Sequence, residues 1–265
     1  MRIAVVLVLA LANVAHADKS GERQAAVAAI PELATVAQGR ARVTVRGRLA
    51  ARQHKPMVAL VEQVIRDVER RFLATKGDAH PAITLCLFDD ATRYHDLAAV
   101  FGSIPSDLGF YLPRHRVAIA NVGLSVGNLR HELVHPLVDD DFPDIPAWLT
   151  EGLGALYGTA RWTDGRFEFL VNYRLRDLQA ALKANKLPGL ATLARAGFAE
   201  VHGPDAGMYY AYGRYVLLYL DRRNTLSAFY AAMRAATGDV REQTKLLEQY
   251  VDDKAFRAWA RALRY

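Results

Sequence analysis

The sequence predicts an α+β protein in which a small N-terminal mixed sheet precedes a mainly helical C-terminal half. Strand-like patterns occur before residue 125, as short apolar or alternating runs separated by turn residues. After residue 125 the apolar residues recur mainly at helical spacing. With 265 residues, of which 52% are apolar, the chain can form a large buried core. Strands followed by helices are typical of the α+β class.

The N-terminal part combines alternating, continuous and helical apolar patterns. Residues 42–46 alternate polar and apolar side chains, as a half-buried strand does, and residues 83–88 form a continuous apolar run. The expected elements are strands at 42–46 and 83–88, helices at 56–73 and 91–100, and a hairpin formed by 110–112 and 117–120.

The C-terminal part is helical apart from one hairpin, which the Asp164-Gly165 turn predicts within residues 162–167. Ser125 can cap the first helix, and Pro136 is expected to kink or end it. The expected helices are 125–138, 146–158, 172–184, 206–222, 225–237 and 239–263, the last with a break near Asp252.

The first seventeen residues have the layout of a cleavable secretory signal. Arg2 precedes an apolar run over residues 3–12, and Ala15-His16-Ala17 precedes polar residues. Ten apolar residues are too few to cross the hydrocarbon core of a membrane. We therefore expect residues 1–17 to be removed, leaving a periplasmic or secreted protein with no transmembrane segment.

Residues 18–265 are expected to form a single domain because no repeat, low-complexity tract or long linker divides them. A sheet-containing half at about 42–137 is followed by a helical half at about 138–265. Residues 18–41 are an N-terminal extension, and the sequence leaves open whether they form a propeptide, a helix or a tether.

The chain is basic, and its single cysteine excludes an intramolecular disulfide. The formal charge of +6 falls to +5 without residues 1–17, because Arg2 is their only charged residue. Arginines are spread singly, without the aromatic-interleaved basic stripe of a nucleic-acid module, so no nucleic-acid partner is expected. A solvated basic surface explains the charge most simply, and it allows weak attraction to an anionic envelope surface. Cys86 lies within a predicted buried strand.

The segment His131-Glu132-Leu133-Val134-His135 matches HExxH and lies in a predicted helix. Residues four apart lie about one turn apart on the same helix face, so both imidazoles can bind one metal ion. Glu132 is rotated by about 100° and can face a water on that ion. The spacing therefore predicts His131 and His135 as ligands of Zn²⁺ and Glu132 as a general base.

A third ligand is expected because catalytic zinc sites have three protein ligands and an open position. Glu151 lies in the next predicted helix among mostly apolar neighbours. A buried carboxylate is costly unless it is paired or bound to metal, which indicates Glu151 as the third ligand. Gly152 and Gly154 would allow this helix to approach the histidine-bearing helix closely.

The segments HELVH and WLTEG together resemble the gluzincin zinc metallopeptidases, in particular the smaller peptidase-MA-like family of exported proteins. The resemblance covers roughly residues 42–250 and is strongest over 109–158. It implies a zincin-like fold, Glu132 as general base and Glu151 as third zinc ligand. It also implies that the strands near 109–111 and 117–120 include an edge strand beside the cleft, able to pair with an extended substrate.

Related enzymes carry a tyrosine near the metal, and the sequence offers three candidates at the start of a predicted helix. We favour Tyr210, whose hydroxyl could stabilise the tetrahedral oxyanion. Tyr209 and Tyr212 remain alternatives, and an aromatic face packed into the core explains each tyrosine equally well.

The chain departs from its thermolysin-like relatives in what surrounds the zinc histidines. Ala155 stands where those relatives carry an aspartate that orients a zinc-bound histidine, which leaves this partner unassigned. The nearby carboxylates are Asp139, Asp140, Asp141 and Asp144, although an acidic surface loop explains them more simply. Surface or turn positions are expected for the histidines at 54, 80, 95, 115 and 202. His202 alone precedes the tyrosine helix, from where it could enter the cleft.

The motifs predict an exported zinc metallopeptidase that hydrolyses a peptide or protein substrate with a metal-activated water and Glu132 as general base. One alternative is a catalytically weak or inactive binding protein on the same scaffold. Another is a zinc amidase that acts on a cell-wall component. Because all four residues of the motif are present, the sequence favours the enzyme.

Overall fold

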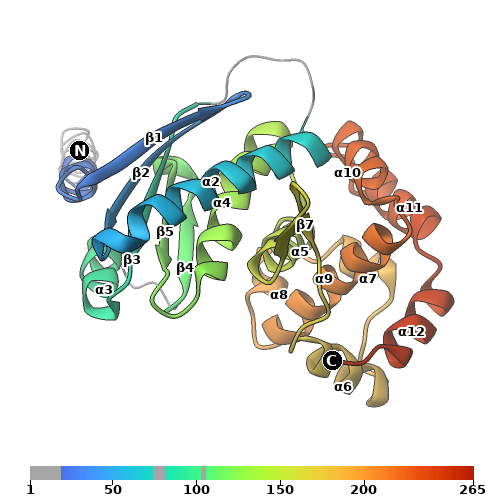
Figure 1. The fold of residues 1–265 in the computed structure, drawn as a ribbon. Helices are drawn as coiled ribbons and strands as arrows, with labels where there is room; N and C mark the ends of the chain where they lie inside the picture. Colours follow the sequence, from blue (N-terminus) through green and yellow to red (C-terminus); the bar gives the residue numbers. More distant parts are fainter. Residues whose placement is uncertain (1–18, 74–80, 103–105) are drawn as a thin grey trace, which may run out of the picture.

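The computed structural model describes residues 19–73, 81–102 and 106–265 and has the expected α+β architecture (Figure 1). A mixed five-stranded sheet occupies one side of the molecule, and the C-terminal helices form the other. The expected signal peptide, residues 1–17, lies outside the described residues. In the part of the chain that is described, no helix has both the length and the apolar character needed to cross a membrane.

The sheet has the strand order β1-β2-β3-β5-β4. The pairs β2/β3 and β3/β5 are parallel, whereas β1/β2 and β4/β5 are antiparallel, so β4 forms one edge. The strands are β1 (Glu32–Gln38), β2 (Ala41–Arg48), β3 (Ile83–Phe88), β4 (Gly109–Leu112) and β5 (Val117–Asn121). Strand β1 belongs to the segment 18–41 and was not expected from the sequence. Residues 19–28 of the same segment form a helix.

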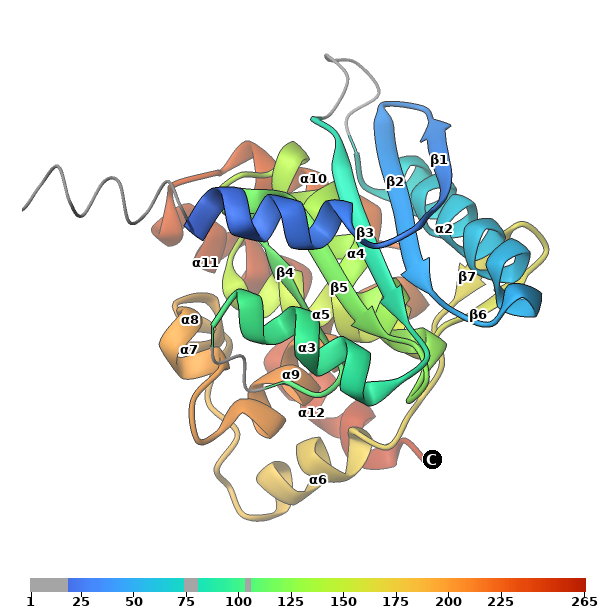
Figure 2. The same cartoon turned by 90° about the vertical axis from the view of Figure 1, so that its left-hand side faces the viewer.

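Helices cover both faces of the sheet. Helix α2 (Ala51–Arg71) and helix α4 (Val126–Asp141) pack on the face that carries the main core. Helix α3 (Ala91–Val100) and the helix at 19–28 lie on the opposite face (Figure 2). The start expected at Pro56 for α2 is wrong, because the helix begins five residues earlier.

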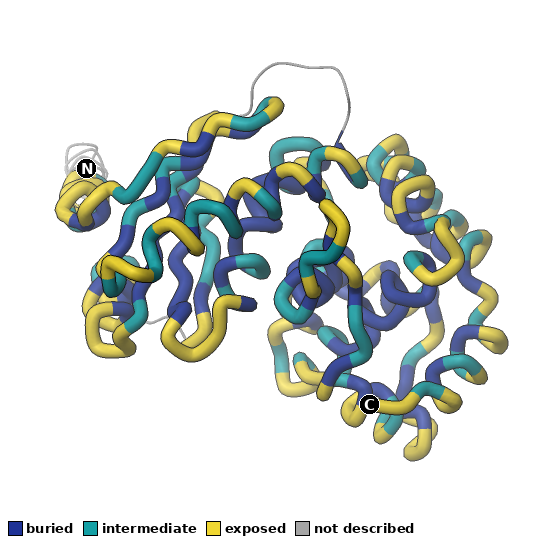
Figure 3. Tube along the Cα trace, in the orientation of Figure 1, coloured by how far each residue is buried: buried dark blue, intermediate teal, exposed yellow. Residues whose placement is uncertain are grey.

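The helical half contains the predicted hairpin and two short helices that sequence analysis did not identify, α7 and α8. Asp252 caps the last helix by accepting a hydrogen bond from Ala255 N, which confirms the expected break. The elements are α5 (Ala147–Gly158), β6 (Arg161–Thr163), β7 (Arg166–Glu168), α6 (Leu175–Lys183), α7 (Leu190–Ala194), α8 (Phe198–Val201), α9 (Ala206–Arg222), α10 (Leu226–Ala235), α11 (Val240–Tyr250) and α12 (Asp253–Ala262). Figure 3 shows buried segments concentrated in the strands and in α4, α5 and α9.

Helix α4 begins as expected and ends later than expected. The Ser125 hydroxyl accepts a hydrogen bond from Gly127 N at 3.0 Å, which confirms the cap. The expectation that Pro136 ends the helix is wrong, because α4 continues to Asp141. Pro136 and the two residues after it are buried, so packing in the core outweighs the missing backbone hydrogen bond.

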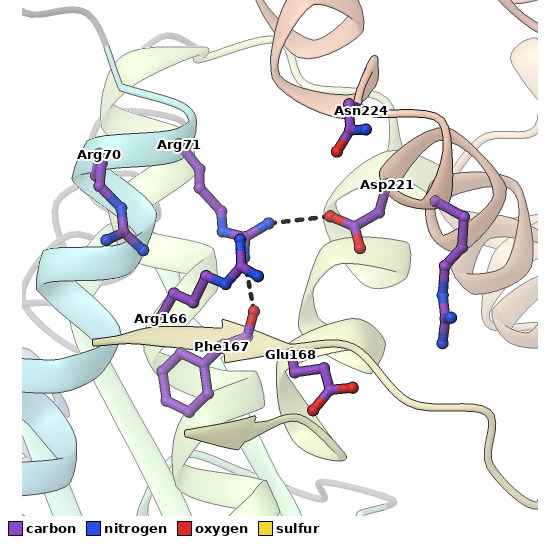
Figure 4. A pocket seen from close by; sticks show the side chains of 8 residues that line it. Arg70, Arg71, Arg166, Phe167, Glu168, Asp221 and Asn224 are labelled. Atoms are coloured by element: carbon purple, nitrogen blue, oxygen red, sulfur yellow. Dashed lines mark hydrogen bonds and ion pairs between the residues drawn. The ribbon is translucent and has the colours of Figure 1, made fainter. Parts of the chain in front are cut away.

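Arg71 connects the sheet half to the helical half. Its guanidinium lies 3.0 Å from Asp221 Oδ1 on α9 and donates to the carbonyl of Phe167 on β7 at 2.6 Å (Figure 4). These groups line a pocket of about 450 Å³. Arg71 and Arg222 each lie in the last turn of a helix, where the helix dipole favours a cation.

Two glycines allow α5 and α9 to pack closely. A Cβ atom at Gly213 would lie 2.6 Å from the carbonyl oxygen of Trp148, and one at Gly152 would lie 2.9 Å from Leu217 Cδ1. Both distances are shorter than van der Waals contact. The separation of these helices therefore depends on the absence of a side chain at each position.

We expect Gly213→Ala to lower the free energy of unfolding by about 1 to 3 kcal/mol, because α5 and α9 must move apart. Gly207→Ala is the matched control on the same helix, since the nearest atom to its Cβ would be Asp177 Oδ2 at 3.9 Å. The control should be neutral or stabilising by about 0.5 to 1 kcal/mol. Urea unfolding of both variants tests this, and equal stabilities would contradict the close packing.

Candidate metal centre

Helices α4 and α5 bring the two predicted histidines and Glu151 together. A Cβ atom at Gly154 would lie 2.8 to 3.0 Å from three ring atoms of His131, so the two helices meet where α5 lacks a side chain. Gly152 was expected at the same contact, but it faces Leu217 and Gly213 of α9 instead. Helix α5 is therefore in close contact with α4 on one side and α9 on the other.

His131, His135 and Glu151 form a group that could hold a metal ion. One ligand atom from each residue lies within 4.8 Å of the others. Glu151 Oε2 is 3.1 Å from His131 Nε2 and 3.9 Å from His135 Nε2. Ligand atoms about 2.0 to 2.2 Å from one tetrahedral ion are roughly 3.4 Å apart, so the observed spacing fits a single ion.

The charges around Glu151 favour its ionised form. Burial by itself raises the pKa of Glu151, but the hydrogen bonds with His131 and His202 bring it well below its usual value. Burial lowers the pKa of His135 to about 4, so its ring is neutral at pH 7. Metal binding requires an ionised carboxylate and neutral imidazole nitrogens, and Glu151 and His135 meet this requirement. Burial lowers the pKa of His131, but its hydrogen bond with Glu151 and the neighbouring carboxylate charges together raise it, so this ring must lose a proton to bind a metal ion.

A hydroxyl group orients His135. Its Nδ1 lies 2.9 Å from Thr150 Oγ1, in the residue immediately before Glu151. When Nδ1 donates its hydrogen to this hydroxyl, the lone pair of Nε2 is left for a metal ion. The ring of Tyr111 stacks on the His135 ring, with centroids 6.4 Å apart and planes at 9°.

The aspartates considered as partners of the histidines contact other groups or solvent. Asp140 pairs with Arg116 at 2.6 Å, and Asp141 pairs with Arg234. Asp144 is exposed. Burial raises the pKa of Asp139 to about 7, and no histidine among the described residues forms a hydrogen bond or ion pair with it. Thr150 therefore takes the place that sequence analysis left unassigned.

Glu132 lies against the edge strand of the sheet. A Cβ atom at Gly109 would be 2.7 Å from Glu132 Cγ, so only glycine fits on β4 at this point. Glu132 is 7% exposed, and burial raises its pKa to about 8. The carboxyl group is thus next to the ligands and enclosed between α4 and β4.

Tyr210 is the tyrosine that lies beside the ligands. Its ring is nearly parallel to that of His131, with centroids 6.4 Å apart and planes at 10°. Burial and the charge of Glu151 raise the pKa of Tyr210. Tyr212 is fully buried and stacks on Phe256, whereas Tyr209 interacts electrostatically with acidic residues outside the site.

His202 joins the site, so the expectation of a surface or turn histidine is wrong for this residue. Its Nε2 lies 2.9 Å from Glu151 Oε1, the oxygen not directed at His131. Its ring stacks on Phe198 at 3.9 Å and meets Tyr210 edge-on. Helix α8 positions His202, and its place before the tyrosine helix was the only sequence signal.

Three of the remaining histidines have partners elsewhere. His54 contacts the carbonyl of Leu49 at 3.1 Å. His95 lies 3.4 Å from Asp107, and His115 packs on the ring of Phe101. His80 lies outside the described residues.

Comparisons with known proteins do not assign the chain to a family. No protein-family model matches it, and a search of curated proteins found no match. The geometry nevertheless combines a three-residue ligand group, a buried carboxyl group and a tyrosine hydroxyl. Such a group can bind a divalent metal ion and place a proton acceptor next to it.

We expect Thr150→Val to weaken metal binding by roughly 10- to 100-fold, because His135 loses the hydroxyl that orients it. Thr150→Ser keeps the hydroxyl and should retain most of the affinity. Competition between each protein and a chelator for Zn²⁺ measures the effect. Circular dichroism serves as the control for folding, and an unchanged affinity in Thr150→Val would show that the hydroxyl does not support the site.

Proposed function

We propose that the protein is an exported, zinc-dependent metallopeptidase of the gluzincin type with a zincin-like fold. The observation that carries the proposal is the convergence of His131, His135 and Glu151, with Glu132 beside them. Two imidazoles and one carboxylate form the donor set of several zinc hydrolases. Export to the periplasm or the cell exterior rests on the sequence of residues 1–17 alone.

A zinc ion in this site would polarise the scissile carbonyl and lower the pKa of water. Glu132 takes a proton from the attacking water and passes it to the leaving amine. This role requires an ionised carboxylate, and a nearby cation would lower the pKa that burial raises to about 8. The position of Glu132 between α4 and β4 suits it to this role.

Two further side chains can assist the reaction, one by stabilising the negative charge that develops on the substrate and one by positioning a ligand. The Tyr210 ring stacks on that of His131, and His202 Nε2 lies 2.9 Å from Glu151 Oε1. Hydrogen-bond donors fixed before the reaction stabilise an oxyanion without reorganising. We assign Tyr210 to this role, and His202 to the positioning of Glu151.

The edge of the sheet provides a binding surface for a peptide. Among the described residues, β4 pairs with β5 alone, so its other side can hydrogen-bond to an extended chain. Gly109 on this strand adjoins Glu132. A peptide added to β4 would therefore lie next to the proton acceptor, which supports a peptide substrate.

We expect Glu132→Gln to retain zinc and to lose at least about 100-fold in kcat, because the amide cannot accept the proton. Glu62→Gln is the matched control, since Glu62 is exposed on α2. Hydrolysis of labelled casein and of a peptide mixture by the zinc-loaded proteins measures the effect.

Full activity in Glu132→Gln would remove this residue from the mechanism. A wild-type protein that holds zinc and hydrolyses no peptide would contradict the proposed activity. It would favour a binding protein or an amidase acting on the cell wall.

A further inference from the structure

Arg174 is a cation beside the candidate metal centre. It immediately precedes α6, and its Cζ lies 5.0 Å from the ring centroid of Tyr210 and 5.4 Å from that of Tyr173. The ring of Tyr210 in turn stacks on His131. Across the described residues, Arg174 forms no ion pair with a carboxylate. Its charge therefore lies near the ligands without a neutralising partner.

The backbone of Arg174 is fixed by a buried turn. Asn172 is 5% exposed, and its side-chain oxygen accepts a hydrogen bond from Arg174 N at 3.2 Å. The Tyr215 hydroxyl on α9 donates to the carbonyl of Asn172 at 3.0 Å. The helix that carries Tyr210 therefore also holds the turn that carries Arg174.

A second guanidinium, that of Arg214, lies on the helix that carries Tyr210. Arg214 is fully buried on α9, one turn after Tyr210, and donates to the carbonyls of Ala155 and Leu170. Its Nε atom has no hydrogen-bond partner among the residues that the structure describes. Burial and the charge of Arg174 both lower the pKa of Arg214, to about 10.

The like charges of Arg174 and Arg214 repel each other, and a bound anion would offset this repulsion. A bound metal ion would add further positive charge, and Glu151 belongs to the group that would hold it. An arginine packed on aromatic rings keeps the donors in its own plane free for a carboxylate. Arg174 and Arg214 are thus complementary in charge to an anionic group on a substrate.

We propose that Arg174, supported by Arg214, forms a subsite for a carboxylate of the substrate, either a free C-terminus or an acidic side chain. This inference rests on the proposed function. Arg174 Cζ is 5.0 Å from the Tyr210 ring centroid, which is 6.4 Å from that of His131, so Arg174 Cζ lies at most about 11.4 Å from the His131 centroid. An extended chain spans about 3.3 to 3.6 Å per residue. The carboxylate therefore lies within about three residues of the scissile bond.

The test uses one peptide sequence in three forms. The first has a free C-terminus, the second has an amidated C-terminus and no acidic residue, and the third is amidated with one internal glutamate. We expect the zinc-loaded protein to hydrolyse the first or the third form with at least about 10-fold higher kcat/KM than the neutral form, as one charged contact provides. Preference for the first form identifies the C-terminal carboxylate, and preference for the third identifies an acidic side chain.

Arg174→Gln should abolish this preference, mainly through KM, while zinc content is unchanged. Arg176→Gln is the matched control, because Arg176 lies in the first turn of α6, just after Arg174, and contacts the ring of Tyr265 instead. It should keep the full preference. Equal kcat/KM for all three forms in the wild type, or an unchanged preference in Arg174→Gln, would overturn the inference.

A binding measurement separates this inference from the proposed function. Zinc-loaded Glu132→Gln protein is titrated with the three peptides in a calorimeter, with and without Arg174→Gln. A lower Kd for a carboxylate-bearing peptide, lost in the double variant, supports the subsite even when no peptide is hydrolysed. Equal Kd values, or no binding of any form, would overturn the inference. Hydrolysis without a carboxylate preference would leave the proposed function intact.

Discussion

The site depends on the packing of α5 between α4 and α9. Gly154 meets the ring of His131, whereas Gly152 and Gly213 allow the opposite contact with α9. This packing places the Glu151 carboxylate in an interior where an isolated charge would be unstable. Hydrogen bonds with His131 and His202 offset that cost. The same close contacts that bury Glu151 thus give it the geometry of a metal ligand.

Helix α9 connects this packing to the side chains around the candidate metal centre. One face of the helix carries Tyr210 and Arg214, and Tyr215 anchors the turn before Arg174. The candidate metal ligands therefore come from α4 and α5, while α9 and the turn that it anchors position the side chains proposed to contact the substrate. A shift of α9 away from α5 would disturb both groups together, because Gly213 contacts Trp148 in the same helix as Glu151.

Local patterns were sufficient to predict the centre of the site and the elements next to it. The strand Ile83–Phe88 and the helix Ala91–Val100 have their expected bounds, because apolar runs and periodicity record burial directly. His131 and His135 were predicted from helical spacing, and Glu151 from the cost of a buried carboxylate. Each of these predictions rests on residues within about one helical turn of the predicted one, or on the next helix along the chain.

Features that depend on distant contacts could not be predicted. Strand β1 is mostly exposed or half-buried and lacks a clear alternation. His202 is 51 positions from Glu151, and only the folded chain brings them together. The partner of His135 is a threonine hydroxyl, and no local pattern predicts that contact. Pro136 indicated a helix end, but tertiary packing outweighed this local preference.

Zinc stoichiometry tests the central claim most directly. Elemental analysis of the purified protein after zinc reconstitution should find about one zinc per chain, as expected for one catalytic site. His135→Ala should lose this zinc, whereas His54→Ala, which changes a histidine bonded to the carbonyl of Leu49, should keep it. A wild-type protein that takes up no zinc, or a His135→Ala variant with the same zinc content as the wild type, would contradict the account.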